Sequence, residues 1–216
     1  MIIRSASDRS LLVSFGGDIS VETHRLVLRL TRGLVGLRSI QNVHPAFSSL
    51  LVEFDPRLHA HHEIEALIRA QCESRCESPD PSARTVELPV VYGGECGPDL
   101  EDVARHACLD PARVIELHAA AEYLVYFLGF ATAFVYLGGL PPELATPRLA
   151  APRRQVPAGS IGIAGPQAGI YPLASPGGWR LIGRTPRRLF DPQGSPPPQL
   201  QMGDRVRFVP VREAAF

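Results

Sequence analysis

The chain contains no lysine, and all 22 of its basic side chains are arginine. Without a lysine amine it can form no Schiff base, carry no biotin and supply no P-loop lysine. Any phosphate or carboxylate bound by this chain is therefore held by guanidinium groups or by backbone N–H groups. Three catalytic signatures are also missing, namely G-x-x-x-x-G-K-[ST], G-x-S-x-G and H-E-x-x-H. A self-contained ATPase or hydrolase of a standard kind is therefore not visible in the sequence.

Cysteines and long apolar runs are scarce as well. The four cysteines are Cys72, Cys76, Cys96 and Cys108, and only the first two lie close in sequence. This spacing favours neither a zinc site nor a disulfide framework. No apolar run is long enough to span a bilayer, and the N-terminal MIIRSASDRS lacks the apolar core of a signal peptide. We expect a cytoplasmic protein with no membrane association. A pI near 7.1 and the lack of a recognition motif argue against nucleic acid as a partner.

Charge is balanced over the whole chain but unevenly distributed along it. Residues 144–212 hold ten arginines and two acids, which gives +8, whereas residues 1–143 hold 12 arginines and 19 acids, which gives −7. Glu213 completes the neutral sum. A basic C-terminal part can face an anionic ligand or an acidic partner. Alternatively, these arginines pair with acids of the preceding part of the chain.

The N-terminal part alternates predicted strands and amphipathic helices. The expected elements are a strand at Ser10–Phe15, a helix from Asp18 to about Leu37, strands at Ile40–His44 and Phe47–Phe54, a helix at about His61–Arg75 and a strand at Arg84–Tyr92. This β-α-β-β-α-β order is that of a ferredoxin-like domain. Gly93-Gly94 then reads as a flexible joint, so we expect an α+β domain at residues 1–93.

Residues 94–216 are expected to contain two linking helices and a β domain. Helices are predicted from Asp99 to about Cys108 and from Asp110 to about Ala121. Ten of the 19 glycines then lie between Gly129 and Gly183. Short apolar segments such as 123–128 and 160–164 alternate there with Pro and Gly, and 205–210 reads as a last strand. Many short strands with such turns predict a closed or sandwiched β structure.

Three groups of residues are candidates for chemistry, and each also has a purely structural explanation. His118, near Tyr123 and Tyr126, can transfer a proton near neutral pH or can be a core histidine. A set of arginines beside prolines and turns can clamp an anion or brace the fold. Glycine turns with nearby donors can form an anion nest or simply tight turns. The arginines are Arg148, Arg153, Arg154 and Arg184; the third group is Gly159, Ser160, Gln167, Tyr171 and Ser175 to Trp179, including Gly177 and Gly178.

The second half of the chain resembles the family of the 5-oxoprolinase B subunit, also called allophanate hydrolase subunit 1, which includes the kinase inhibitor KipI. The resemblance rests on an ordered series of short motifs. These are Gly129-Phe130, Tyr136-Leu137-Gly138-Gly139, Pro147-Arg148, Pro152-Arg153, Val156 to Ser160, Ile163 to Gly165, Gln167, Gly169 to Pro172, Ser175 to Trp179, Gly183 to Pro186 and Gly203 to Val206. Segments 45–56 and 88–100 agree as well. One turn departs from the family pattern Gly-Phe-x-Pro-Gly-Phe, because residues 131–133 are Ala-Thr-Ala.

The resemblance implies a cyclophilin-like β-barrel after the ferredoxin-like domain. It implies the B subunit of a complex that opens 5-oxoproline to L-glutamate with ATP hydrolysis, working with subunits A and C, with ATP bound by the complex. The catalytic residues would then be His118, Arg148, Gln167 and Tyr171. The phosphate-binding residues would be Arg153, Arg184, Gly159, Ser160, Gly177 and Gly178. Two alternatives stay open: a KipI-like inhibitor that binds a sensor histidine kinase, and a carboxyltransferase-type subunit related to urea or allophanate.

Overall fold

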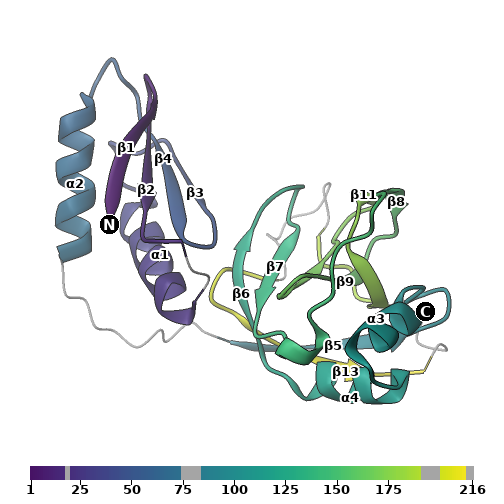
Figure 1. The fold of residues 1–216 in the computed structure, drawn as a ribbon. Helices are drawn as coiled ribbons and strands as arrows, with labels where there is room; N and C mark the ends of the chain where they lie inside the picture. The colour runs from purple at the N-terminus through teal and green to yellow at the C-terminus, as the bar shows by residue number, and fades with distance from the viewer. Residues whose placement is uncertain (18–19, 74–83, 191–199, 213–216) are drawn as a thin grey trace. The chain divides into compact units, whose positions relative to one another are not determined.

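The computed structural model describes residues 1–17, 20–73, 84–190 and 200–212. It divides into two compact units, Met1–Pro81 and Ser82–Phe216 (Figure 1). The predicted boundary near Gly94 therefore falls inside the second unit. The reason is the strand Thr85–Tyr92 (β5), which pairs with barrel strands and not with the N-terminal sheet.

The first unit is a four-stranded antiparallel sheet with two helices. Its elements are β1 (Ile2–Ser7), β2 (Ser10–Ser14), α1 (Val21–Leu34), β3 (Asn42–Pro45), β4 (Ser49–Glu53) and α2 (His61–Glu73). The strand order is β1-β2-β4-β3. Both helices pack against the sheet and against each other. A buried stripe of α1, which includes Val27, Leu30 and Leu34, forms the core with Leu11 and Leu50 of the sheet.

This arrangement corrects the expected order of strands. The edge of the sheet is formed by β1, which sequence reasoning missed because nearly all of its side chains are exposed and show no alternation. The strand predicted to complete a ferredoxin-like domain is β5 of the other unit. The ferredoxin-like assignment is therefore not confirmed. Helix α1 is capped by Ser20, whose hydroxyl accepts from the Thr23 N–H. Asp18, where this helix was expected to begin, lies outside the described residues.

The second unit contains a closed barrel of seven strands, in the order β10-β7-β6-β13-β5-β12-β9. These strands are β6 (Tyr123–Leu128), β7 (Val135–Gly138), β9 (Ser160–Ala164), β10 (Gln167–Ile170), β12 (Arg180–Arg184) and β13 (Arg205–Pro210), together with β5. A two-stranded sheet is formed by β8 (Arg153–Val156) and β11 (Ser175–Gly177). The expected closed β structure is confirmed, and it is consistent with a cyclophilin-like barrel.

Two helices follow β5, as expected. They are α3 (Leu100–Ala107) and α4 (Pro111–Ala120), and a 3-10 turn lies at Pro142–Leu144 (η1). Helix α3 contacts β12 and η1. Helix α4 contacts β13 (Figure 1). Gly93 and Gly94 have φ of 70° and 51°, values that favour glycine, and the Gly93 N–H bonds to the Ile182 carbonyl. The predicted flexible joint is thus a hydrogen-bonded turn of the barrel unit.

Candidate functional site

Two of the predicted residues, Arg148 and Tyr171, lie together at a group of packed rings. This aromatic cluster consists of Phe134, Tyr136, Tyr171 and Trp179. The Phe134 ring lies 4.8 Å from that of Tyr171 and 5.4 Å from that of Trp179, in edge-to-face geometry. The guanidinium of the exposed Arg148 lies over the Trp179 ring, 5.6 Å from its centroid. An arginine stacked on an aromatic ring keeps its N–H groups available for an anion.

The ring of Tyr171 is buried, unlike Arg148. It follows β10 directly and is 1% exposed. Burial raises the pKa of its hydroxyl, so the group stays protonated at neutral pH. A Cβ at Gly177 would lie 2.3 Å from the hydroxyl oxygen of Tyr171. Gly177 is therefore needed to let this ring pack, which explains the glycine without a bound phosphate.

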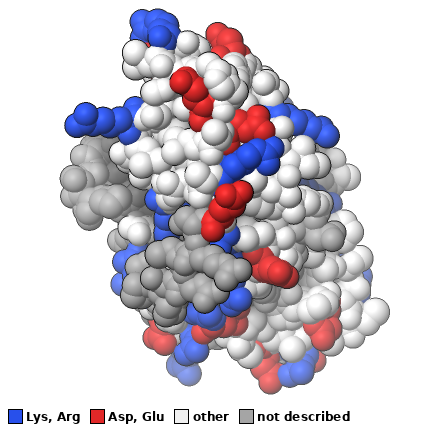
Figure 2. Space-filling view, turned by 90° about the vertical axis from the view of Figure 1, so that its left-hand side faces the viewer, with Lys and Arg blue, Asp and Glu red and all other residues white. Residues whose placement is uncertain are grey.

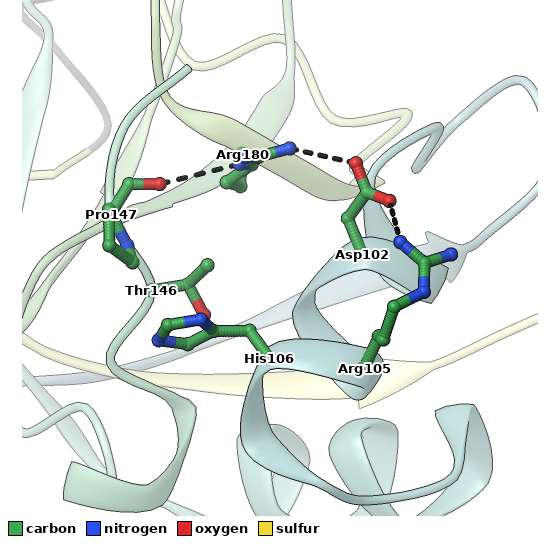
Figure 3. Close-up of a pocket in the computed structure, with 6 residues that line it drawn as sticks. All are labelled: Asp102, Arg105, His106, Thr146, Pro147 and Arg180. Carbon is green, nitrogen blue, oxygen red and sulfur yellow. Dashed lines mark hydrogen bonds and ion pairs between the residues drawn. The ribbon is translucent and has the colours of Figure 1, made fainter. Parts of the chain in front are cut away.

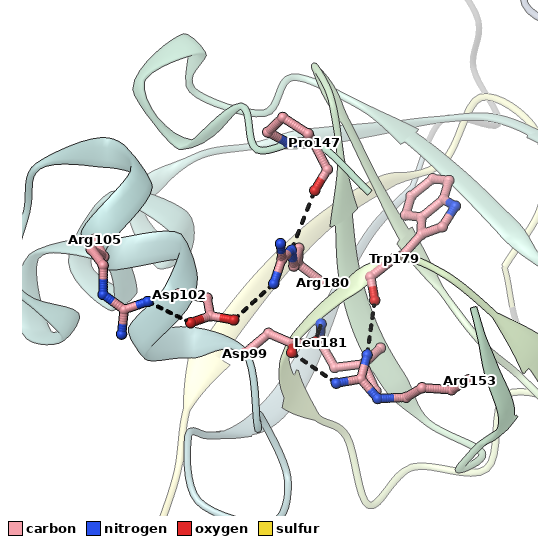
Figure 4. Close-up of polar contacts among 8 residues, drawn as sticks. All are labelled: Asp99, Asp102, Arg105, Pro147, Arg153, Trp179, Arg180 and Leu181. Atoms are coloured by element: carbon pink, nitrogen blue, oxygen red, sulfur yellow. Dashed lines mark hydrogen bonds and ion pairs between the residues drawn. The ribbon is translucent and has the colours of Figure 1, made fainter. Parts of the chain in front are cut away.

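Arg153, predicted to bind phosphate, is bound to an aspartate of its own chain (Figure 4). Its guanidinium donates to Asp99 at 2.7 Å and to the Trp179 carbonyl at 3.5 Å. The second carboxylate oxygen of Asp99 accepts the Leu181 N–H at 2.7 Å. Asp99 is 4% exposed and caps the start of α3 by position, so this ion pair joins α3, β8 and β12. The structure supports the bracing role for Arg153.

The predicted anion nest uses amides that are already bonded. The Gly159 N–H donates to the Tyr171 carbonyl at 2.7 Å, and the Ser160 N–H donates to the Pro157 carbonyl at 3.3 Å. A Cβ at Gly159 would lie 2.4 Å from the Thr185 carbonyl, so this glycine permits close backbone packing. These two residues therefore do not fit a phosphate of ATP.

The remaining predicted residues surround this region without forming one site. Arg184 ends β12 and is half-buried, with its side chain next to Gly159. Gln167 begins β10 and is half-buried, paired with Ala164 across the strands. The Gly178 carbonyl accepts the Leu149 N–H. The structure brings Arg148 to the aromatic cluster but leaves the other predicted donors committed to the fold or apart.

His118 belongs to a different environment from Arg148 and Tyr171. It lies on α4, is fully buried, and its Nδ1 is 2.8 Å from the Tyr92 hydroxyl. Its ring stacks on Phe208, with centroids 4.7 Å apart. Burial lowers the pKa of His118 to about 3. An imidazole with this pKa and no exposure is a poor general base near pH 7, so the structure favours the core role.

Several polar residues at α3 escaped the sequence reasoning. Asp102, Arg105 and His106 share one face of α3 and line a cavity of about 310 Å³ with Thr146, Pro147 and Arg180 (Figure 3). The sequence could have indicated this shared face, because the three polar residues stand at i, i+3 and i+4 of a short predicted helix. Asp102 was overlooked because an acid in the first turn of a helix is already explained by the helix dipole. Arg180 was overlooked because it reaches Asp102 only through the tertiary fold.

Four of the ten arginines in residues 144–212 pair with acids of the preceding segment. Arg205 and Arg207 both pair with Glu122, and their guanidinium groups hold the Glu122 pKa below its usual value. Arg153 and Arg180 pair with the aspartates of α3. On the face shown in Figure 2, basic and acidic side chains are interspersed. The excess positive charge of residues 144–212 is thus partly paired within the second unit.

Two absences among the described residues bound the chemistry. Within 1–17, 20–73, 84–190 and 200–212, no three His, Cys, Asp or Glu side chains gather as a metal site. Over the same part of the chain, no helix has the length and apolar character needed to cross a membrane.

Comparison with known proteins identifies relatives over nearly the whole chain. The family model described as carboxyltransferase domain, subdomain C and D, matches residues 1–200. The chain is 47% identical to the 5-oxoprolinase B subunit of Escherichia coli O157:H7, over 95% of this chain and 94% of that protein. The crystal structure of TTHA0988 matches with a TM-score of 0.82 at 36% identity, covering 94% of this chain and 40% of that longer chain. Kluyveromyces lactis urea amidolyase shares the fold, with a TM-score of 0.78 at 22% identity over 98% of this chain and 15% of its own.

Proposed function

The chain belongs to the carboxyltransferase subdomain C and D family, among relatives named as the B subunit of 5-oxoprolinase, and we propose that it is the B subunit of an ATP-dependent 5-oxoprolinase. This complex would open the lactam of 5-oxoproline to L-glutamate, with subunits A and C as partners. The observation that carries the proposal is 47% identity extending over 95% of the chain. At that coverage the matched segment extends over both units of this chain.

We infer that the active site is shared, with this chain supplying some of its residues and partner subunits supplying the others. A lactam is a stable amide, so ring opening needs activation, and phosphorylation of the carbonyl oxygen by ATP supplies it. Among the residues predicted to be catalytic, His118 is buried and held by Tyr92, so it is a poor base for activating a nucleophile. The region similar to this chain makes up 40% of TTHA0988, where it is joined to further sequence. Both points support a chain that contributes to a site without completing it.

We assign Arg148 the anion-binding role within this proposal. Its guanidinium is exposed and is oriented by the Trp179 ring. Such a group can hold the carboxylate of 5-oxoproline or a transferring phosphoryl group as negative charge develops. The buried ring of Tyr171 belongs to the same cluster and helps to keep it packed.

The test is reconstitution. The chain is purified alone and with subunits A and C, and ATP-dependent release of glutamate from 5-oxoproline is measured. We expect turnover only from the assembled complex, and a loss of at least about tenfold in kcat/KM with Arg148→Ala. Arg38→Ala, which removes an exposed arginine of the first unit, is the control and should retain activity.

Each alternative outcome has a definite meaning. Turnover by the lone chain would refute the shared site. Failure to bind the C subunit, combined with tight binding to a sensor histidine kinase, would replace the enzyme by the KipI-like inhibitor. Normal activity of Arg148→Ala in a working complex would leave the assignment of the chain to the enzyme intact and remove the role of that arginine.

A further inference from the structure

A cavity beside α3 has two arginines among the residues of its wall. It is formed by Asp102, Arg105 and His106 of α3, by Thr146 and Pro147, and by Arg180 of β12 (Figure 3). Its volume of about 310 Å³ lies at the small end of the range for ligand pockets. None of its side chains has a part in the site proposed above.

One carboxylate holds two guanidinium groups at the wall of this cavity. Asp102 Oδ1 accepts from Arg105 Nη1 at 2.8 Å, and Oδ2 accepts from Arg180 Nη1 at 2.7 Å (Figure 4). Arg180 also donates from Nε to the Pro147 carbonyl at 3.3 Å. Arg180 is thus fixed from two sides, and only 23% of its side chain is exposed. Orientation before binding lowers the entropy that a ligand must overcome.

The charge and the remaining donors of the cavity favour an anion. A guanidinium has five N–H groups, and the contacts above use one of Arg105 and two of Arg180. Two arginines face one aspartate, so the wall carries a net positive charge, and the exposed His106 adds a ring N–H. The remaining donors match the oxygens of phosphate or carboxylate.

We propose that this cavity is a binding site for one small oxyanion, held by Arg105 and Arg180 with Asp102 as the residue that positions them. The volume suits inorganic phosphate or an amino-acid carboxylate. The site is independent of the role proposed for Arg148 and of the identity of the complex.

Calorimetric titration of the full chain tests the proposal, with inorganic phosphate and L-glutamate as separate probes at constant ionic strength. We expect saturable binding of one probe at one site, and the preferred probe identifies phosphate or carboxylate as the ligand group. Arg105→Gln should weaken this binding at least about tenfold, because it removes a charged donor. Arg105 is 75% exposed, so this change should leave the fold intact, whereas Arg180→Gln serves as a second variant whose melting temperature is checked.

Arg113→Gln is the matched control. Arg113 is also exposed and also forms an i, i+3 ion pair, with Glu116 on α4, but it does not line the cavity. Binding by this variant should equal that of the unmodified chain. Absence of saturable binding of both probes would overturn the proposal. Equal weakening by Arg105→Gln and Arg113→Gln would also overturn it, because the effect would then be one of general charge.

Discussion

Replacement of His118 by phenylalanine should remove a pH-dependent part of the stability of the barrel unit. His118 is completely buried, its Nδ1 bonds to the Tyr92 hydroxyl, and its Nε2 has no hydrogen-bond partner among the described residues. Burial lowers its pKa to about 3, so the folded chain keeps the ring neutral over the working range of pH. Phenylalanine retains the stacking on Phe208 but cannot titrate.

Proton linkage gives the direction and the size of the effect of His118 on the free energy of unfolding. An unfolded histidine has a pKa of about 6.5, so below that pH the unfolded chain binds a proton that the folded chain excludes until about pH 3. The free energy of unfolding therefore falls as the pH falls through this window. For one such histidine the loss between pH 7.5 and pH 5 is about 2 kcal/mol. His24 has a similarly lowered pKa of about 4, but it belongs to the first unit.

The assay can be confined to the barrel unit because Trp179 is the single tryptophan of the chain. Urea unfolding followed by tryptophan fluorescence at pH 7.5 and pH 5 gives the pH-dependent difference for each protein. His118→Phe should reduce this difference by about 2 kcal/mol relative to the unmodified chain. Tyr92→Phe removes the hydrogen bond but retains the buried histidine, so it should keep the pH dependence. An unchanged pH difference in His118→Phe would refute the neutral buried histidine and would revive His118 as a candidate proton carrier.

Two further substitutions test the backbone and the buried ion pair by the same urea assay. Ala133 has φ of 60°, so Ala133→Gly should stabilise the unit by about 0.5–1 kcal/mol, the relief of strain less the added chain entropy. Ala131→Gly, in the same turn but without a positive φ, should destabilise the unit. A change of the same sign in the free energy of unfolding for both variants would contradict the strain argument. Asp99→Ala should cost about 2–4 kcal/mol, since it leaves the Arg153 guanidinium and the Leu181 N–H without their acceptor. Asp99→Asn, which keeps an acceptor oxygen, should cost less, and equal losses would assign the effect to packing.

Local patterns predicted the barrel strands well. The segments 123–128, 160–164 and 205–210 were expected as strands, and the structure has the same bounds for β6, β9 and β13. Each is a short apolar or alternating segment between glycine or proline turns. The residues next to each strand therefore determine where it begins and ends. The helix α4 was placed for the same reason, since Asp110 accepts the Arg113 N–H at its start.

Strand partners were harder to predict because they depend on distant residues. The strand Thr85–Tyr92 has a strand pattern, but nothing in that pattern states which sheet it joins. Its partners are β12 and the parallel strand β13, which lies near the C-terminus. The difference between the expected boundary and the observed division of the chain follows from this single strand.

The residues of the candidate site were hard to predict for the same reason, because their partners lie far away in the sequence. Arg153 was expected either to bind an anion or to brace the fold, and its partner Asp99 precedes it by 54 residues. The amides of Gly159 and Ser160 were expected to be free for an anion, and the fold bonds them to carbonyls. Residue type indicated which groups can bind an anion, while tertiary contacts decided that Arg148 and the α3 cavity keep donors available.

The altered turn between β6 and β7 bears on the choice between enzyme and inhibitor. Ala133 stands where the family usually has glycine, and its φ of 60° is a value that glycine adopts freely and alanine adopts at a cost. The turn is nevertheless closed by backbone bonds from Gly129 to Phe134 and from Phe134 to Ala131. Phe134 is anchored in the aromatic cluster, which supplies the packing that can hold a strained backbone. The missing Pro and Gly therefore change the energy of this turn and leave its backbone closed, so they give no ground for preferring an inhibitor over an enzyme subunit.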